Sequence, residues 1–318
     1  MEQLKLYLVI PCYNEQEVLP ITALKIREKM QFLQQCGKIT ADSKVVFVDD
    51  GSKDKTWEII CALHKADELF RGIKLAHNKG HQNALLAGMM TVREECDAII
   101  SMDADLQDDI NAIDGMIDRC YEGCDIVYGV RCARDTDTAF KRGTAHGFYK
   151  VMQLLGVEIV NDHADYRLMT KRALAALADF DEVNLFLRGL VPLLGFKTAT
   201  VEYERGERAA GESKYPLKKM IAFALEGITS MSVKPIRLVT VLGFLIFAIS
   251  IIMLLYSLIR HWIGATVTGW TSTVVSIWAI GGLQLLAIGV IGEYIGKIYL
   301  ETKHRPKYTV EEYLNKDS

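Results

Sequence analysis

Short, continuous apolar runs alternate with longer segments of helical periodicity over the first 210 residues. The apolar runs, which are rich in β-branched residues, predict strands at 6–10, 45–48, 73–76, 98–102 and 126–128. Because these runs are continuous rather than alternating, both faces of the strands are expected to be buried. The segments between them predict helices at 18–35, 55–66, 82–95 and 111–121. This alternation predicts an α/β domain with a doubly wound parallel sheet.

The C-terminal third has a different pattern. Residues 238–259 and 262–292 contain no charged side chain. Each run is longer than the length of about 20 residues that a helix needs to cross a bilayer core. Lysines and arginines precede the first run and follow the second, whereas only Arg260 is charged between them. By the positive-inside rule, both ends of this hairpin are expected in the cytosol and the loop around 261–270 outside. The sequence therefore predicts a two-helix transmembrane hairpin.

Composition and charge exclude some classes of protein. Lys and Arg total 37 against 40 Asp and Glu, a net charge of −3, so the bulk cationic attraction that nucleic acids require is missing. All seven cysteines precede residue 133 without zinc-ligand spacing, which favours buried thiols in a reducing compartment. We expect no secretory leader, because the first apolar run is short and lacks a small-residue cleavage site. We expect a cytosolic globular domain anchored at the cytoplasmic membrane, with no nucleic-acid partner.

Ligands of such sheets bind beyond the carboxyl ends of the strands, where this chain places several acidic residues. Asp49 and Asp50 follow the second strand. Either Asp50 or Ser52 caps the next helix, or a carboxylate here accepts hydrogen bonds from a base or a ribose. Asp103-Ala104-Asp105 follows the fourth strand. Two carboxylates at this spacing suit Mg²⁺ or Mn²⁺ holding a pyrophosphate, whereas Asp108 and Asp109 suit the first turn of a helix.

Cationic residues gather farther along the chain. Arg131, Arg134, Lys141 and Arg142 suit a second phosphate or form a solvated surface. Asp165, which follows them, is compatible with a helix cap. Arg205, Arg208 and Lys214 lie on a Gly-rich loop, which could close over a diphosphate or attract anionic lipid. Residues 214–237 then predict a helix that lies at the membrane interface or packs on the globular domain. The histidines, His81 among them, lack metal-ligand spacing and are interpreted as structural or surface residues.

Taken in order, the motifs of the chain resemble those of glycosyltransferase family 2, and more narrowly those of the polyprenyl-phosphate glycosyltransferases. The motifs are Val9-Ile10-Pro11-x-Tyr13-Asn14-Glu15, Val48-Asp49-Asp50-Gly51-Ser52-x-Asp54-x-Thr56, Asn78-x-Gly80, Met102-Asp103-Ala104-Asp105-Leu106-Gln107, Asp165-Tyr166-Arg167-Leu168-Met169 and Gly211-Glu212-Ser213-Lys214-Tyr215-Pro216. The resemblance covers nearly the whole chain. It implies a GT-A fold with a mixed sheet and an inverting transfer of one sugar.

The resemblance also implies roles for individual residues. The nucleotide-binding set is Pro11, Tyr13, Glu15, Asp49, Asp50, Lys79, Asp103 and Ala104. The metal, Mg²⁺ or Mn²⁺, would be held by Asp103, Asp105 and Gln107. Asp165 and Asp105 would be catalytic, with Asp165 facing the reacting sugar. Arg131 and Arg142 would hold the acceptor phosphate, and Arg205, Arg208 and Lys214 the diphosphate.

The implied domains are a GT-A domain at 1–212, interfacial helices at 213–237, a transmembrane hairpin at 238–292 and a cytoplasmic tail at 293–318. The implied donor is UDP-glucose, with UDP-N-acetylglucosamine and GDP-mannose as alternatives, and the implied acceptor is undecaprenyl phosphate. Relatives of this kind associate as tetramers, so a homo-oligomer is expected. A processive synthase would need the Gln-x-x-Arg-Trp motif, which does not occur. A non-catalytic membrane scaffold that binds nucleotide-sugar is the alternative from another class.

Overall fold

The computed structural model describes residues 3–131, 163–204, 206, 228–263 and 269–315. The chain forms two compact units. The first comprises residues 1–149, 158–216 and 305–318, and the second comprises 150–157 and 217–304. The acidic motifs all fall in the first unit, whereas both uncharged runs fall in the second.

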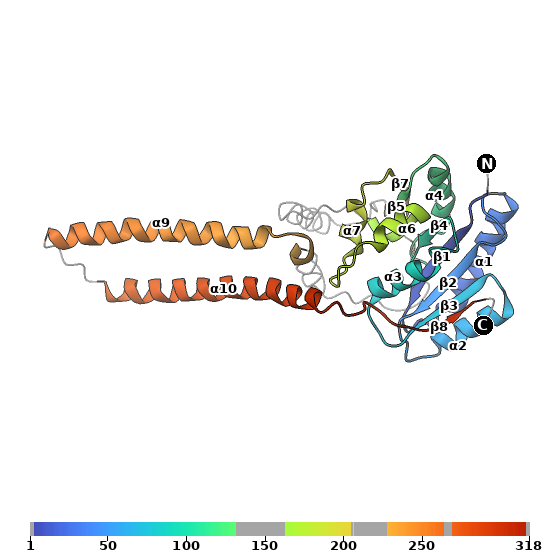
Figure 1. The fold of residues 1–318 in the computed structure, drawn as a ribbon, viewed down its shortest axis with the longest axis horizontal. Coiled ribbons are helices and arrows are strands. Elements are labelled where there is room, and N and C mark those ends of the chain that lie inside the picture. The colour runs from blue at the N-terminus through green and yellow to red at the C-terminus, as the bar shows by residue number, and fades with distance from the viewer. Residues whose placement is uncertain (1–2, 132–162, 205, 207–227, 264–268, 316–318) are drawn as a thin grey trace. The chain divides into compact units, whose positions relative to one another are not determined.

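The first unit is built on an eight-stranded mixed sheet with the order β7-β5-β6-β4-β1-β2-β3-β8 (Figure 1). The strands are β1 (Leu6–Cys12), β2 (Lys44–Asp49), β3 (Phe70–Leu75), β4 (Ala98–Ser101), β5 (Ile126–Arg131), β6 (His163–Thr170), β7 (Thr198–Tyr203) and β8 (Val310–Leu314). β1 pairs in parallel with both β2 and β4, and β2 with β3. The carboxyl ends of these four strands therefore meet at one edge, as the sequence predicted.

The prediction of a purely parallel sheet is wrong in three pairings. β6 runs antiparallel to both of its neighbours, β4 and β5, and β8 runs antiparallel to β3. Continuous hydrophobicity reports burial on both faces but not strand direction, so the pattern could not show these reversals. The mixed sheet agrees with what the family resemblance implied.

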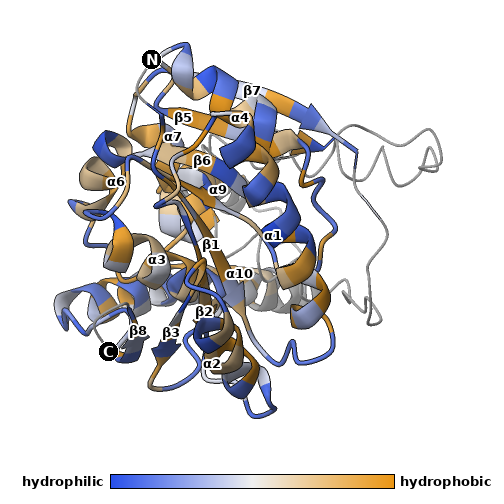
Figure 2. Ribbon diagram, turned by 90° about the vertical axis from the view of Figure 1, so that its right-hand side faces the viewer, coloured by the Kyte–Doolittle hydropathy of each residue, from blue (hydrophilic) through white to orange (hydrophobic). Residues whose placement is uncertain are grey.

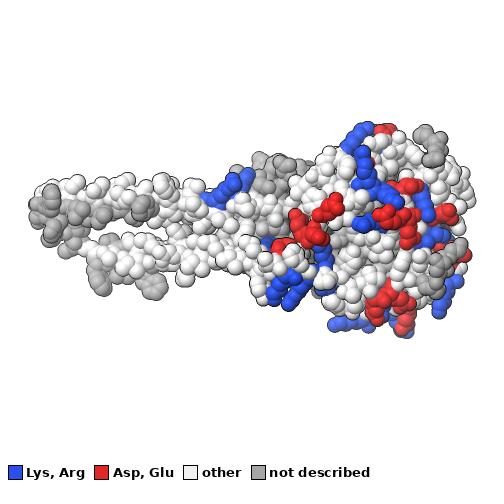
Figure 3. All heavy atoms as spheres, in the orientation of Figure 1, with Lys and Arg blue, Asp and Glu red and all other residues white. Residues whose placement is uncertain are grey.

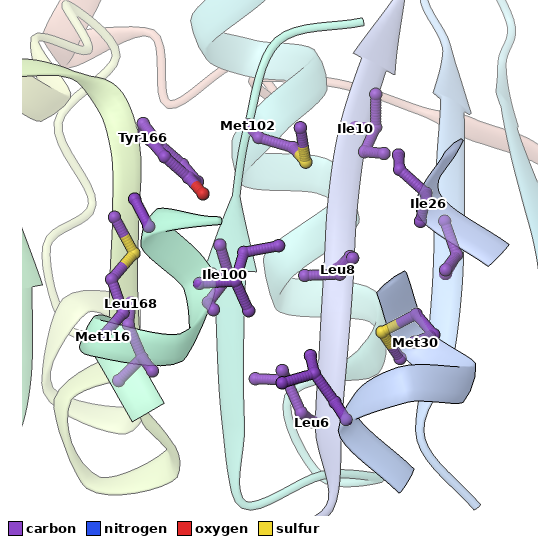
Figure 4. Close-up of a cluster of buried hydrophobic side chains, with 14 of the residues drawn as sticks. Leu6, Leu8, Ile10, Ile26, Met30, Ile100, Met102, Met116, Tyr166 and Leu168 are labelled. Atoms are coloured by element: carbon purple, nitrogen blue, oxygen red, sulfur yellow. The ribbon is translucent and has the colours of Figure 1, made fainter. Parts of the chain in front are cut away.

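Helices cover both faces of the sheet. They are α1 (Leu19–Gln35), α2 (Thr56–Ala66), α3 (His81–Val92), α4 (Ala112–Tyr121), α6 (Lys171–Ala178) and α7 (Leu187–Leu193). Alternate residues of β1, Leu6, Leu8 and Ile10, contribute to a core that also receives Ile26 and Met30 of α1 (Figure 4). β1 and β5 are predominantly hydrophobic along their length (Figure 2). Because both faces of β1 are buried, apolar residues fill nearly every position, and polar side chains are left to the strand ends.

The second unit contains two long helices, α9 (Lys234–Trp262) and α10 (Trp270–Thr302). Figure 3 shows few charged side chains along them. Among the residues described, one segment, Ala279–Thr302, is long and apolar enough to cross a membrane. Nζ of Lys297 donates to Oγ of Ser230, and the hydroxyl of Tyr294 donates to the carbonyl of Ser232, both at 2.6 Å. These bonds tie the end of α10 to the segment that precedes α9. Most of the predicted interfacial segment, 213–227, lies outside the described residues.

The C-terminal segment differs from the tail expected at 293–318. α10 continues to Thr302, and β8 then adds an edge strand to the sheet of the first unit. The hydroxyl of Tyr313 on β8 donates to Glu95 at 3.0 Å and accepts from Arg71 at 3.0 Å. The segment is five residues long and has two adjacent glutamates at its centre, so its sequence does not predict a strand, and its place is set by these tertiary contacts.

Candidate active site

The loops after β1 and β2 are interlocked by hydrogen bonds between side chains and backbone. The N–H of Asn14 donates to Oγ of Ser52 at 3.0 Å, and the N–H of Glu15 donates to Oγ1 of Thr56 at 2.9 Å. In return, Oδ1 of Asn14 accepts the N–H of Lys53 at 2.9 Å. Asn14 adopts a left-handed φ of 56°, which asparagine tolerates better than most residues. The second motif thus fixes the backbone of the first, next to the half-exposed Tyr13.

Asp50 holds a third loop. Its two carboxylate oxygens accept the N–H groups of Lys79 at 2.7 Å and Gly80 at 2.9 Å, and its burial raises its pKa. Gly51 between the loops has a φ of +65°, and a Cβ there would lie 2.7 Å from the nitrogen of Asn78. The alternative that Asp50 or Ser52 caps α2 is wrong, because Lys55 occupies the cap position and the N–H of Thr56, the first residue of the helix, donates to Asp54 at 3.0 Å. Asp50 therefore positions the loop that carries Lys79.

One carboxylate oxygen of Asp49 accepts no hydrogen bond from the described residues. Oδ1 accepts the N–H of Ser52 at 3.3 Å, whereas Oδ2 is buried and accepts no hydrogen bond from any described residue. Burial raises the pKa of this carboxyl group. Because an unsatisfied buried oxygen costs free energy, this position suits a ligand that supplies an N–H or O–H. Of the adjacent pair, Asp49 is thus the better placed to contact a nucleoside.

The Asp103-Ala104-Asp105 turn follows β4 and is fixed from two sides. Oγ1 of Thr22 on α1 donates to the carbonyl of Ala104 at 2.7 Å, and Oδ1 of Asp105 accepts the N–H of Gln107 at 3.1 Å. Oδ1 of Asp103 is buried and accepts no hydrogen bond within the described part of the chain, although Nε2 of His81 lies 3.5 Å from it. Burial raises the pKa of Asp103 to about 6. An unpartnered carboxylate oxygen fits a divalent cation.

The remaining predicted metal ligands do not by themselves complete a coordination shell. Among the described residues, no cluster of three or more His, Cys, Asp or Glu side chains has the arrangement of a metal site. The carboxylates of Asp103 and Asp105, with the buried Gln107, are the donors that the turn provides. Such a donor set suits Mg²⁺ or Mn²⁺ that takes its other ligands from water and phosphate oxygens.

Asp165 lies within β6, so its interpretation as a helix cap is wrong. Two arginines and a histidine surround it. Nη2 of Arg167 donates to Oδ1 at 2.7 Å, Arg188 donates to both oxygens, and Nε2 of His81 lies 3.5 Å from Oδ2. Although burial favours the neutral acid, the contacts from His81, Arg188 and Arg167 hold the pKa of Asp165 well below its usual range. Asp165 is consequently a fixed, charged carboxylate.

The predicted phosphate-binding residues are only partly described. Arg131 ends β5, where Nη2 donates to Oδ1 of Asp108 at 3.1 Å and Nε donates to the hydroxyl of Tyr203 at 3.1 Å. The guanidinium of Arg131 remains partly exposed. Burial by itself would lower the pKa of Arg131, but the negative charge of Asp108 raises it. The other predicted members lie outside the described residues: Arg142, Arg205, Arg208 and Lys214.

Three residues were missed as members of this site. His81 was set aside as structural, yet Nε2 lies 3.5 Å from Oδ1 of Asp103 as well as from Asp165. Arg188 gave no signal, because nothing in a helical apolar segment marks an arginine as the partner of Asp165. Asp108 was interpreted as a first-turn acid, whereas it holds Arg131. The position of His81 directly after Asn78-x-Gly80 was the one available hint.

A cavity of about 810 Å³ opens along α1 and the loop after Asp105. Lys25, Lys29 and Phe32 line it together with Gln107 and Asp108. Neither Asp103 nor Asp165 belongs to its wall. The convergence of orphaned and paired carboxylates at the strand ends, rather than this cavity, therefore marks the candidate active site.

Comparison with known proteins identifies the family of the chain. Residues 7–177 match the model of glycosyl transferase family 2. The chain is 52% identical over 306 residues to YkoT, an uncharacterized glycosyltransferase of Bacillus subtilis (strain 168), covering 96% of this chain and 91% of that protein. It is 39% identical over 310 residues to the bactoprenol glucosyl transferase of Shigella phage SfV, covering 97% of this chain and 98% of that protein.

Among solved structures, mannosyltransferase PcManGT from Pyrobaculum calidifontis, in complex with GDP-Man and Mn²⁺, aligns at 14% identity with a TM-score of 0.42, covering 94% of this chain and 85% of that chain. A similarity at this level adds no argument to that of the sequence relatives. The matched motifs and the near-full-length relatives show that the chain is a glycosyltransferase and belongs to glycosyltransferase family 2.

Proposed function

We propose that the protein transfers one sugar from a nucleotide-sugar, UDP-glucose first, to undecaprenyl phosphate, with inversion, at the cytoplasmic face of the membrane. The observation that carries this proposal is the similarity to a bactoprenol glucosyl transferase over 97% of the chain. The alignment extends past the family domain at 7–177 into α9 and α10. A relative that shares only the nucleotide-sugar fold would not extend so far.

The donor would lie beyond the carboxyl ends of β1, β2 and β4. Asp49 offers an unpartnered oxygen to the nucleoside, beside Pro11, Tyr13 and Glu15. Asp103, Asp105 and Gln107 would hold Mg²⁺ or Mn²⁺. The metal, when bound, would neutralise charge on the departing nucleoside diphosphate. The observation that supports this role is that Oδ1 of Asp103 accepts no hydrogen bond from the described residues.

The acceptor phosphate needs positioning rather than a strong base. A phosphate monoester has a second pKa near ~6, so its oxygen is already largely anionic in the cytosol. Arg131, held by Asp108 and Tyr203, supplies a fixed guanidinium for it. Asp165 is a poor proton acceptor because cationic neighbours lower its pKa. In our mechanism Asp165 orients the sugar, and in-line attack by the phosphate oxygen inverts the anomeric centre.

The membrane part would bring the enzyme to its acceptor. In this proposal α9 and α10 both span the bilayer, and the catalytic unit and both termini lie in the cytosol. The polyprenyl tail of the acceptor then remains in the bilayer, and the catalytic unit binds its phosphate at the membrane interface. The tetramer that the family resemblance implies is part of the same proposal.

The decisive assay offers radiolabelled UDP-glucose, UDP-N-acetylglucosamine and GDP-mannose to purified protein with undecaprenyl phosphate. Each donor is tested with Mn²⁺, with Mg²⁺ and with EDTA. We expect a metal-dependent lipid product from UDP-glucose. Product from another donor would correct the sugar. Protein that binds UDP but forms no lipid product from a wider donor panel would favour the scaffold.

A further inference from the structure

The first turn of α3 connects the donor loops to both acidic centres. Asp50 fixes the N–H groups of Lys79 and Gly80 immediately before the helix. The next residue, His81, places Nε2 3.5 Å from Oδ1 of Asp103 and 3.5 Å from Oδ2 of Asp165. Membership of the family does not by itself give His81 a role in binding or catalysis. Its place between the two carboxylates is the first part of the argument.

α7 approaches the same carboxylate from another direction. Arg188 donates from Nε to Oδ1 of Asp165 at 3.3 Å and from Nη2 to Oδ2 at 3.2 Å. Oε1 of Gln82, adjacent to His81 on α3, accepts the N–H of Leu187 at 2.9 Å. α3 and α7 are therefore joined beside the residues that each contributes to Asp165. A two-point contact from a planar guanidinium fixes the plane of a carboxylate as well as its position.

The three basic partners of Asp165 differ in how far their side chains are exposed. The side chain of Arg167 is 1% exposed and Asp165 is 9% exposed, so this pair forms the buried ion pair. The side chains of Arg188 and His81 are 32% and 43% exposed. Arg167 already neutralises the buried charge from within the sheet. The partly exposed side chains of Arg188 and His81 instead contact the carboxylate while remaining accessible to solvent.

We propose that Arg188 and His81 are positioning residues that hold the Asp165 carboxylate in its orientation toward the reacting sugar. This inference rests on the proposed sugar transfer. Neither residue needs to exchange a proton in this role. Because a displacement of about 1 Å in a catalytic arrangement can cost about 100-fold in rate, loss of the two-point contact should lower kcat far more than it weakens nucleotide binding.

The test measures kcat, the KM of the donor and the Kd of UDP for Arg188→Gln, Arg188→Lys and His81→Gln. Each substitution is made alone and together with Asp165→Asn. Arg172→Gln is the matched control, because Arg172 also pairs with a carboxylate, that of Asp125, but is largely exposed on α6.

We expect Arg188→Gln to lower kcat about 100-fold while the Kd of UDP changes by less than about threefold. Arg188→Lys retains the charge and still loses most of the rate, because an ammonium cannot form the two-point contact. His81→Gln should also lower kcat without weakening UDP binding. In the Asp165→Asn background the same substitutions should add less than about threefold, since residues that act through a common partner are not additive. Arg172→Gln should leave kcat unchanged.

Wild-type kcat in Arg188→Gln or Arg188→Lys would overturn the proposal, as would an undiminished effect in the Asp165→Asn background. If Arg188→Gln does not fold, as shown by loss of UDP binding, Arg188→Lys decides the question. The wild-type protein serves as the separate test of the underlying function. No lipid product from wild type counts against sugar transfer itself, whereas an active wild type beside fully active variants counts against positioning alone.

Discussion

Oδ1 of Asp108 lies 3.1 Å from Nη2 of Arg131, and the two side chains differ sharply in exposure. The carboxylate is 1% exposed and the guanidinium 28%. The hydroxyl of Tyr203 donates to the same carboxylate oxygen and accepts from Nε of Arg131. A buried acid and a buried phenol thus fix a cation whose remaining surface faces outward. This is the arrangement expected of an arginine that is held ready for an anionic ligand.

Replacing Asp108 should therefore affect the acceptor rather than the donor. We expect Asp108→Asn to raise the KM for polyprenyl phosphate about tenfold, because the guanidinium loses its charged anchor. The KM for the nucleotide-sugar should stay close to that of wild type. Asp109→Asn is the control, since among the described residues the side chain of Asp109 accepts only the nearby N–H of Asn111. An equal rise in both Michaelis constants would contradict the assignment of Arg131.

Asp103 and Asp165 should differ in how much turnover depends on them. In the proposed mechanism Oδ1 of Asp103, which accepts no hydrogen bond from the described residues, would bind the metal, and Asp165 would orient the sugar. We expect Asp103→Asn to lower kcat more than Asp165→Asn does, because loss of a metal ligand removes stabilisation of the leaving diphosphate. The measurement compares kcat of the two purified variants at saturating Mn²⁺, with thermal unfolding as the check on folding. Equal, complete loss in two well-folded variants would count against the division of roles.

The interlocked loops predict an effect on nucleotide binding from a residue that need not touch the nucleotide. Thr56→Val removes the oxygen that accepts the N–H of Glu15, and an unsatisfied backbone group costs about 1–3 kcal/mol. We expect weaker UDP binding, measured by calorimetry, because the loop that carries Tyr13 and Glu15 loses its support. Thr91→Val is the matched control, since Oγ1 of Thr91 bonds only within α3, to the carbonyl of Ala87. Unchanged UDP affinity in Thr56→Val would show that the loop holds without this bond.

The sequence anticipated the part of the fold in which local pattern and tertiary burial agree. β1 and β2 are continuous apolar runs because both of their faces are buried, and the acidic motifs follow them at the strand ends. β6 could not be recognised in the same way. It contains Asp165 and Arg167, whose charges make the segment polar in sequence although Arg167 is 1% exposed in the structure.

The missed site residues share one physical cause. His81, Asp108 and Arg188 are defined by contacts that form only after the chain has folded. A single histidine or arginine in a sequence is most often a solvated surface residue. The spacing of residues along the chain does not distinguish such a residue from one that pairs with a buried carboxylate. Asp165 was recognised from a motif, but the two-point contact from Arg188 depends on how α7 packs beside α3. Such partners become visible only in three dimensions.

The proposed topology makes opposite predictions for the loop between α9 and α10 and for the C-terminal end of the hairpin. His261→Cys, at the end of α9, should react with a membrane-impermeant thiol reagent in intact cells. Lys303→Cys, just beyond α10, should react only after the cells are opened. The seven native cysteines precede residue 133 and should be protected in intact cells with the cytosolic domain. Labelling of Lys303→Cys in intact cells would reverse the proposed orientation.

The edge strand β8 should contribute to the stability of the catalytic unit through Gly72 on β3. A Cβ at Gly72 would lie 2.5 Å from Cγ2 of Ile60, 3.0 Å from Cδ1 of Leu314 and 3.1 Å from Cζ3 of Trp57. We expect Gly72→Ala to lower the free energy of unfolding by about 1–3 kcal/mol, the usual effect of overpacking. Thermal unfolding in detergent measures the change. Gly243→Ala is the control, because a Cβ at Gly243 would meet nothing within 4 Å. If Gly72→Ala is no less stable than Gly243→Ala, β8 does not pack against β3 and α2 as tightly as the contacts of Leu314 indicate.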